Sequence, residues 1–219
     1  NSNIIRMNRI SLDENLQEQY SCGSPLFPCQ VDDEDIEEFI SNEVPWHWHH
    51  WIEMLYVYEG EGIINAGENT YQIKKGNGIF INMDTIHQMR KIAHEPLHYY
   101  VIAFDPVLVS GASQFLFQHK YVDPVIASAE LKEVPLDQEI PWQKKLLEQF
   151  LLVYELFKSQ QFGYELLIRN GLTNIWLTLS EWFLRHPIVN HSNIPNSMAD
   201  RTKKMLNYIE QQFGNELSI

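Results

Sequence analysis

The stretch of sequence that decides the fold is Trp46-His47-Trp48-His49-His50-Trp51-Ile52-Glu53. On a β-strand, side chains alternate between the two faces, so His47 and His49 point the same way, and Glu53 keeps that parity if the strand continues. Neutral imidazoles and a carboxylate are ligands for zinc, iron, nickel or manganese. The pattern therefore predicts either a transition-metal site or a set of histidines that line a polar interior and bind water or an organic ligand.

The region around this stretch, residues 46–125, carries the β signals. Short β-branched and aromatic runs alternate with glycine-containing turns at 59–62 and 75–78, and a last strand is predicted at about 97–104. Closely spaced short strands of this kind favour an antiparallel sandwich or barrel. A meander that folds back in this way brings a fourth candidate ligand, His87, opposite the first three.

Two spacing motifs make the prediction more specific. The first is matched by His47-x-His49-x3-Glu53-x6-Gly60. The second begins at Gly76 and reaches His87 eleven residues later, although Asn82 and Asp84 stand where the motif has proline and glycine. The segment resembles a cupin, a jelly-roll β-barrel. The resemblance implies that the four ligand positions converge inside the barrel, where they either hold one divalent transition metal (zinc, nickel or iron) or contact an organic effector without a metal.

The barrel interior is also the expected pocket for a small-molecule effector. Strand parity places Glu53, Leu55 and Val57 inside, with Met54, Tyr56 and Tyr58 facing outward or onto helices. Aromatic faces beside polar histidines suit a sugar or a small aromatic molecule, although each aromatic residue has a role in the core as its alternative. The predicted ligand-binding residues are His47, His49, Glu53, Leu55, His87, Trp48 and Tyr99. The histidines expected to be structural or at the surface are His50, His94, His98, His119, His186 and His191.

From Trp142 onward the apolar period becomes helical. The first helix, which Pro141 opens, has an apolar face at Leu146, Phe150, Val153 and Phe157. A second helix follows Gly163, and its heptad-like seam consists of Ile168, Leu172, Ile175, Leu179 and Trp182. We predict that this seam forms a homodimer. The alternative is that it packs on the first helix of the same chain.

Beyond the helices, residues 187–197 are predicted to form a linker, and Ser197 to Asp200 looks like a capping box. The whole chain resembles an AraC-type transcriptional regulator that breaks off inside its DNA-binding domain. The predicted domains are an N-terminal arm and first strands (1–45), the cupin barrel (46–125), a connector with dimerisation helices (126–186), the linker (187–197) and an incomplete helix-turn-helix domain (198–219).

The resemblance implies a function in ligand sensing and dimerisation, without catalysis. DNA is expected to be read by the full-length protein only, because no recognition helix can be identified in this sequence. The alternatives are a cupin metalloenzyme, such as a dioxygenase or isomerase, and a metal-free cupin that serves as a dimerising binding module.

Composition agrees with these expectations. The chain has 16 basic and 29 acidic residues, a net charge of −13, which argues against a stand-alone nucleic-acid binder. The acidic run from Asp32 to Glu38 is interpreted as a solvated turn before a strand. Cys22 and Cys29 are predicted to be free thiols in a reducing compartment. The longest apolar run, Tyr99 to Phe104, is too short for a membrane span, and a cytoplasmic location is expected.

Overall fold

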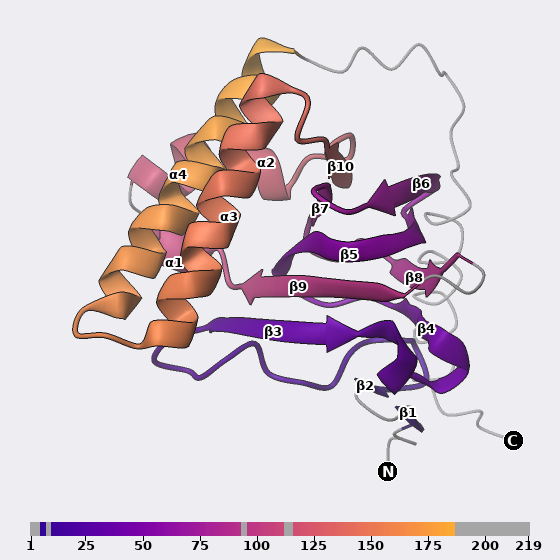
Figure 1. The fold of residues 1–219 in the computed structure, drawn as a ribbon. Helices are drawn as coiled ribbons and strands as arrows, with labels where there is room; N and C mark the ends of the chain where they lie inside the picture. The colour runs from indigo at the N-terminus through magenta and orange to yellow at the C-terminus, as the bar shows by residue number, and fades with distance from the viewer. Residues whose placement is uncertain (1–4, 8–9, 93–95, 112–115, 187–219) are drawn as a thin grey trace, which may run out of the picture.

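The computed structural model describes residues 5–7, 10–92, 96–111 and 116–186 (Figure 1). Most strands belong to one antiparallel, barrel-like assembly of the jelly-roll type, which confirms the predicted fold class. The strands are β1 (Ile5–Met7), β2 (Ile10–Leu12), β3 (Cys29–Asp35), β4 (Glu43–His47), β5 (Ile52–Ala66), β6 (Asn69–Lys74), β7 (Gly78–Ile81), β8 (His87–Lys91), β9 (Leu97–Phe104) and β10 (Glu133–Leu136). The helices are α1 (Val107–Ser110), α2 (Asp123–Ile126), α3 (Pro141–Ser159) and α4 (Tyr164–Arg185), and short 3₁₀ or π turns cover Ile36–Glu38, Ile40–Asn42 and Gln118–Val122.

The long strand β5 holds the barrel together because it belongs to two sheets. Its first half pairs with β7 and β9, and its second half pairs with β6 and β8. The register with β9 shifts between Val57 and Glu59, and Gly60 follows with a φ of +80°. A Cβ at Gly60 would overlap the carbonyl of Pro96, so only glycine allows the strand to turn here.

The interpretation of the acidic run as a solvated turn is wrong for its first residues, which belong to strand β3. Residues Cys29 to Asp35 pair with β9 over their whole length, from Cys29 opposite Phe104 to Asp35 opposite His98. Aspartate has a low strand propensity, but the hydrogen-bonded ladder with β9 overrides it. Because β3 and β10 both join the sheets, the barrel extends beyond the predicted range 46–125 at both ends.

Two apolar cores lie on opposite faces of the sheet that contains β5. Leu55 and Val57 belong to the core inside the barrel. Met54 and Tyr56 belong to the larger core, in which the sheet packs against the helices. The predicted alternation along β5 is therefore confirmed, and it places Glu53, two residues before Leu55, on the interior side.

Helices α3 and α4 form the predicted antiparallel pair on one side of the barrel (Figure 1). Pro141 occupies the first turn of α3, as expected. Gly171 brings the helices close together, since a Cβ at this position would lie 2.6 Å from Cγ2 of Val153. The pair buries the apolar face of each helix within one chain.

The prediction that this seam forms a homodimer is therefore wrong, because the seam packs within its own chain. Four of its members, Ile168, Leu172, Ile175 and Leu179, are at most 1% exposed in the single chain, inside the core between helices and sheet. The fifth, Trp182, stacks on Trp142 of α3 with ring centroids 4.7 Å apart. Periodicity identifies the face that a helix buries, but it does not identify what covers that face.

The other predictions for these regions have simple outcomes. Cys22 and Cys29 are free thiols, as predicted. The linker 187–197 and the helix predicted from residue 198 lie outside the described residues. Among the helices that the structure describes, none is both long and apolar enough to span a bilayer.

Replacement of Leu172 by alanine tests the intramolecular position of the seam. We expect the variant to lose about 2–5 kcal/mol of unfolding free energy, because the cavity left in this core has no solvent to fill it. Leu116→Ala, outside the helical pair, is the control. Its side chain is 65% exposed, so the loss should stay below about 0.5 kcal/mol. Urea titrations of both variants measure the difference, and equal losses would contradict the internal seam.

Candidate functional site

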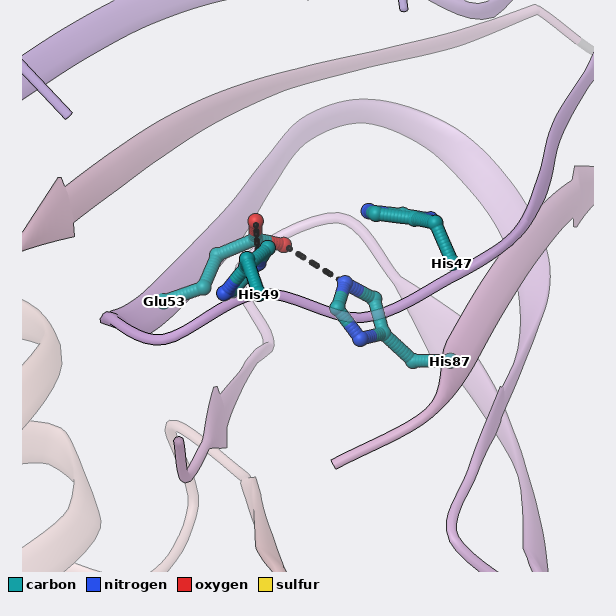
Figure 2. Close-up of side chains that lie close together, drawn as sticks. All are labelled: His47, His49, Glu53 and His87. Atoms are coloured by element: carbon teal, nitrogen blue, oxygen red, sulfur yellow. Dashed lines mark hydrogen bonds and ion pairs between the residues drawn. The ribbon is translucent and has the colours of Figure 1, made fainter. Parts of the chain in front are cut away.

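The four predicted ligands lie together at one end of the barrel (Figure 2). His47 ends β4 and stands directly opposite His87, the first residue of β8, with ring centroids 4.1 Å apart. Glu53 lies at the start of β5, and His49 lies in the segment between β4 and β5. Ligand atoms from all four side chains lie within 4.8 Å of one another.

The route by which His49 reaches this cluster differs from the prediction. The strand does not continue from His47 to Glu53, because β4 ends at His47 and β5 begins at Ile52. His49 is instead held by Trp51, whose ring stacks on the imidazole at 4.7 Å and whose carbonyl binds Nδ1 at 3.0 Å. The four side chains converge as expected, but an irregular turn rather than a continuous strand places His49.

All three imidazoles are oriented in the same way. The Nδ1 atom of each ring lies within hydrogen-bonding distance of a backbone carbonyl two residues away in the chain. The pairs are His47 with Pro45 (2.8 Å), His49 with Trp51 (3.0 Å) and His87 with Thr85 (2.8 Å). A ring that donates from Nδ1 to a carbonyl leaves Nε2 as the atom available to a metal, which is the usual arrangement around metal-bound histidines.

The Nε2 atom of His87 provides a test of whether a metal fits. It is buried without a hydrogen-bond partner, and its closest charged neighbour is Oε1 of Glu53 at 3.7 Å. Buried polar atoms without a partner are rare, because desolvation carries a free-energy cost that no bond offsets. A divalent transition metal among the four side chains would satisfy this atom, so the residues fit a metal of the zinc, nickel or iron type.

The charges in the cluster also suit a cation. Burial would raise the pKa of Glu53, but the hydrogen bond with His49 and the neighbouring imidazoles hold that pKa down at about 2. Burial would lower the pKa of His49, but the bond and charge of Glu53 raise it. Burial lowers the pKa of His47 well below its ordinary value and that of His87 to about 4. At neutral pH the cluster thus holds one carboxylate and two uncharged imidazoles ready to coordinate.

The two departures from the second cupin motif are accommodated in the turn before His87. Asn82 is buried, and its side-chain N–H groups donate to the carbonyls of Val125 and Leu131 at 2.9 and 2.7 Å. Asp84 adopts a φ of +58°, the left-handed conformation that glycine would supply. The turn is therefore preserved, and Asn82 anchors it to the connector beyond the barrel.

A cavity of about 320 Å³ opens beside the ligands. The predicted residues Leu55 and Tyr99 line it, together with His47, Glu53 and His87. Trp48 does not: its indole N–H donates to the carbonyl of Asn15 at 2.9 Å, and Trp51 lines the cavity instead. Cavity residues that sequence reasoning missed come from the N-terminal segment and from β3, and they include Glu18, Tyr20, Gln30, Asp32 and Glu34. Asp33 on β3 lines the cavity as well, so the alternation of Gln30, Asp32 and Glu34 was only part of the available signal. That signal is readable only once residues 29–35 are known to form a strand.

Other proteins resemble this chain in sequence and structure. The model of the AraC-like ligand binding domain matches residues 36–172. An HTH-type transcriptional regulator of Bacillus subtilis (strain 168), YdeC, is 24% identical over 218 residues, which cover 97% of this chain and 71% of that protein. Among solved structures, BH2720 from Bacillus halodurans is 25% identical over 36% of this chain and 63% of its own, with a TM-score of 0.33. An RmlC-like cupin from Methanocaldococcus jannaschii is 15% identical over 35% of this chain and 70% of its own, with a TM-score of 0.31.

The depressed histidine pKa values predict how stability depends on pH in the chelator-treated protein. Between pH 6.5 and 4 the unfolded chain protonates His87 while the folded chain does not, so unfolding becomes easier as the pH falls. From pH 7 to pH 5 the loss from His87 alone is about 2 kcal/mol. Urea titrations at these pH values should give a shallower dependence for His87→Gln. The exposed His50, changed to glutamine, is the control, and an unchanged dependence in His87→Gln would refute the account.

Proposed function

Because this chain belongs to the AraC-like ligand-binding domain family, we propose that it is the effector-sensing region of a DNA-binding transcriptional regulator. The observation that carries the proposal is the cavity beside the histidine cluster. The cluster itself and the part of the cavity wall that β5 and β9 form lie within the segment that matches the family, residues 36–172. The effector is a small molecule of the size of a sugar or a small aromatic compound. The regulator works in the cytoplasm, where its DNA lies.

The metal is the second part of the proposal. His47, His49, Glu53 and His87 hold one zinc, nickel or iron ion, which when bound supplies a Lewis-acidic centre next to the cavity. The carbonyls behind the three rings hold the imidazoles in place for it. Its role in a sensor is to rigidify the cavity wall where Glu53 meets the histidines.

A cupin metalloenzyme, either a dioxygenase or an isomerase, is the alternative that the same cluster favours. Three histidines and one glutamate leave coordination positions open to a substrate. The family match weighs toward a binding role, since it describes a ligand-binding domain. A regulator responds to its ligand without consuming it, so the two candidates differ in whether the ligand is converted.

We also propose that the regulator is a homodimer, with the contact on the outer face of the helical pair. The buried seam is unavailable, but five leucines on α3 and α4 are about half or more exposed: Leu152, Leu166, Leu167, Leu177 and Leu184. Exposed apolar residues on neighbouring helices are a common basis for association. A monomer in light scattering at high concentration would exclude this dimer. DNA contact belongs to the full-length regulator, as the likeness to an HTH-type protein suggests.

The metal proposal predicts the metal content of protein purified without a histidine tag. We expect about one equivalent of a transition metal in the native chain and a large loss in His49→Ala, because a ligand is removed. His50→Ala is the matched control: this neighbouring imidazole is exposed, pairs with Asp84 at 2.6 Å and should not affect the metal. Elemental analysis gives the answer. Equal contents in native protein and His49→Ala would rule out this cluster as the metal site.

The sensor proposal is tested with the full-length regulator. DNA fragments selected by that protein from a genomic pool should share one operator sequence, and a reporter fused to the operator should respond to one class of small molecule. Tyr99→Ala, in the cavity wall, should abolish the response while operator binding without effector stays unchanged. A protein that selects no DNA, or that converts the molecule chemically, would contradict the sensor and favour the enzyme.

A further inference from the structure

The turn that leads into His87 contacts two of the three histidines of the metal cluster. It covers residues 82–86, between β7 and β8. The carbonyl of Thr85 lies 2.8 Å from Nδ1 of His87, and the backbone N–H of Asp84 donates to the carbonyl of His49 at 2.8 Å. A displacement of this turn would therefore move both imidazoles, whose rings lie 5.0 Å apart in the cluster (Figure 2).

On its other side, the same turn is hydrogen-bonded to residues 123–136, which run from α2 to β10 and are called the α2–β10 segment below (Figure 1). The backbone N–H of Asn82 donates to the carbonyl of Lys132 at 2.8 Å, and the hydroxyl of Thr85 donates to the same carbonyl at 3.2 Å. Thr85 thus bonds in two directions, through its hydroxyl to this segment and through its carbonyl to His87.

The side chain of Asn82 makes two further bonds between the turn and the segment. Asn82 is buried, and its amide group donates to the carbonyls of Val125 at 2.9 Å and of Leu131 at 2.7 Å. Its Oδ1 accepts from the backbone N–H of Met83 at 2.8 Å, which fixes the start of the turn. The amide cannot shift alone, because buried donors that lose their acceptors carry a free-energy cost.

Asparagine at position 82 has donors that the motif residue lacks. Proline, which stands here in the second cupin motif, has no backbone N–H and no side-chain donor. It could make none of the three hydrogen bonds by which Asn82 holds the α2–β10 segment. The junction between the turn and the segment therefore depends mainly on the asparagine.

The α2–β10 segment in turn packs against α4. Val125 and Leu131 are buried in the core between sheet and helices, to which Trp176 of α4 also belongs. The indole N–H of Trp176 donates to the carbonyl of Tyr121, four residues before Val125, at 2.8 Å. Hydrogen bonds and core contacts therefore form a continuous connection from His87 to α4.

We propose that Asn82 is a positioning residue that couples the metal cluster to the α2–β10 segment and, through it, to α4. When a bound metal holds the histidines, the turn is held with them, and the amide of Asn82 keeps the carbonyls of Val125 and Leu131 in place. Such coupling is reciprocal, so a firmly held segment also favours the ligand geometry that the metal requires. The inference rests on the metal part of the proposed function and adds the route by which occupancy of the cluster reaches the helices.

Hydrogen exchange of the native chain measures this coupling. In the zinc-loaded chain, the backbone amides of residues 125–132 should exchange at least about tenfold more slowly than in the chelator-treated chain, because local opening of the segment then also disturbs the bound metal. Residues 150–159 of α3 are the internal reference, since they lie outside both the turn and the segment. Their exchange should slow less than that of residues 125–132.

Two variants test the route. Asn82→Ala removes both side-chain donations to the segment, and Thr85→Val removes the hydroxyl but keeps the carbonyl beside His87. Each should weaken zinc binding by about tenfold, because ligands lose support from outside the metal's own coordination shell. At saturating zinc, each should also lose the extra protection of residues 125–132. With Co²⁺ in place of zinc, the visible absorption of Asn82→Ala should shift, since that spectrum reports the ligand geometry.

Ile73→Ala is the control for lost stability. Ile73 is buried on β6, opposite Gly62 of β5 and outside both the turn and the segment. Its replacement should destabilise the chain but leave the zinc affinity, the Co²⁺ spectrum and the metal-dependent protection of residues 125–132 as in the native chain. A merely structural asparagine would make Asn82→Ala behave in the same way as this control.

Several results would overturn the coupling. These are an unchanged zinc affinity in both turn variants, extra protection of residues 125–132 that persists in both, or native protection of these residues that does not exceed that of the α3 reference. Each of them refutes the role of Asn82 and leaves the metal site in place. The metal proposal fails on a different result, a native chain that takes up no transition metal, and the coupling then fails with it.

Discussion

The contact between a partly buried carboxylate and three buried imidazoles is the interaction on which the rest of this structure depends. Glu53 remains ionised in the barrel because His49 bonds to it and His47 and His87 stand close by. Each imidazole in turn is anchored by a backbone carbonyl, so the cluster requires an ordered turn on both sides. Burying these groups without such partners would carry a large free-energy cost. These hydrogen bonds therefore fix the orientation of the three imidazoles at this end of the barrel.

The bent strand β5 connects this cluster to the architecture. Its first half carries Glu53 and joins the sheet that packs on the helices, and its second half joins the sheet that carries His87. Gly60 allows the passage from one sheet to the other. A single strand thus supplies a ligand, a wall of the cavity and the face on which α3 and α4 rest. Successive side chains of β5 point to opposite faces, so Leu55 lies inside the barrel and Met54 packs in the core beneath the helices.

The neighbours that a segment meets in the fold decide the environment of both the helical pair and strand β3. Burial against the sheet explains why the apolar seam of α4 faces its own chain, while several leucines on the outer side of α3 and α4 stay exposed. The acidic segment Cys29–Asp35 forms a strand of the barrel because its backbone hydrogen-bonds to β9. The result is a cavity with imidazoles and a carboxylate at one end and carboxylates along one wall.

The amino-acid sequence by itself determined the type and spacing of the four ligands, the strand at Leu97–Phe104 and the helix that begins at Pro141, because these features depend on neighbours in the chain. Only the tertiary structure decided that residues 29–35 form a strand, that Trp51 lines the cavity in place of Trp48, and that the seam of α4 is internal. The physical reason is the same in each case. Periodicity shows that a face is buried, but the register between distant strands and helices decides what that face meets.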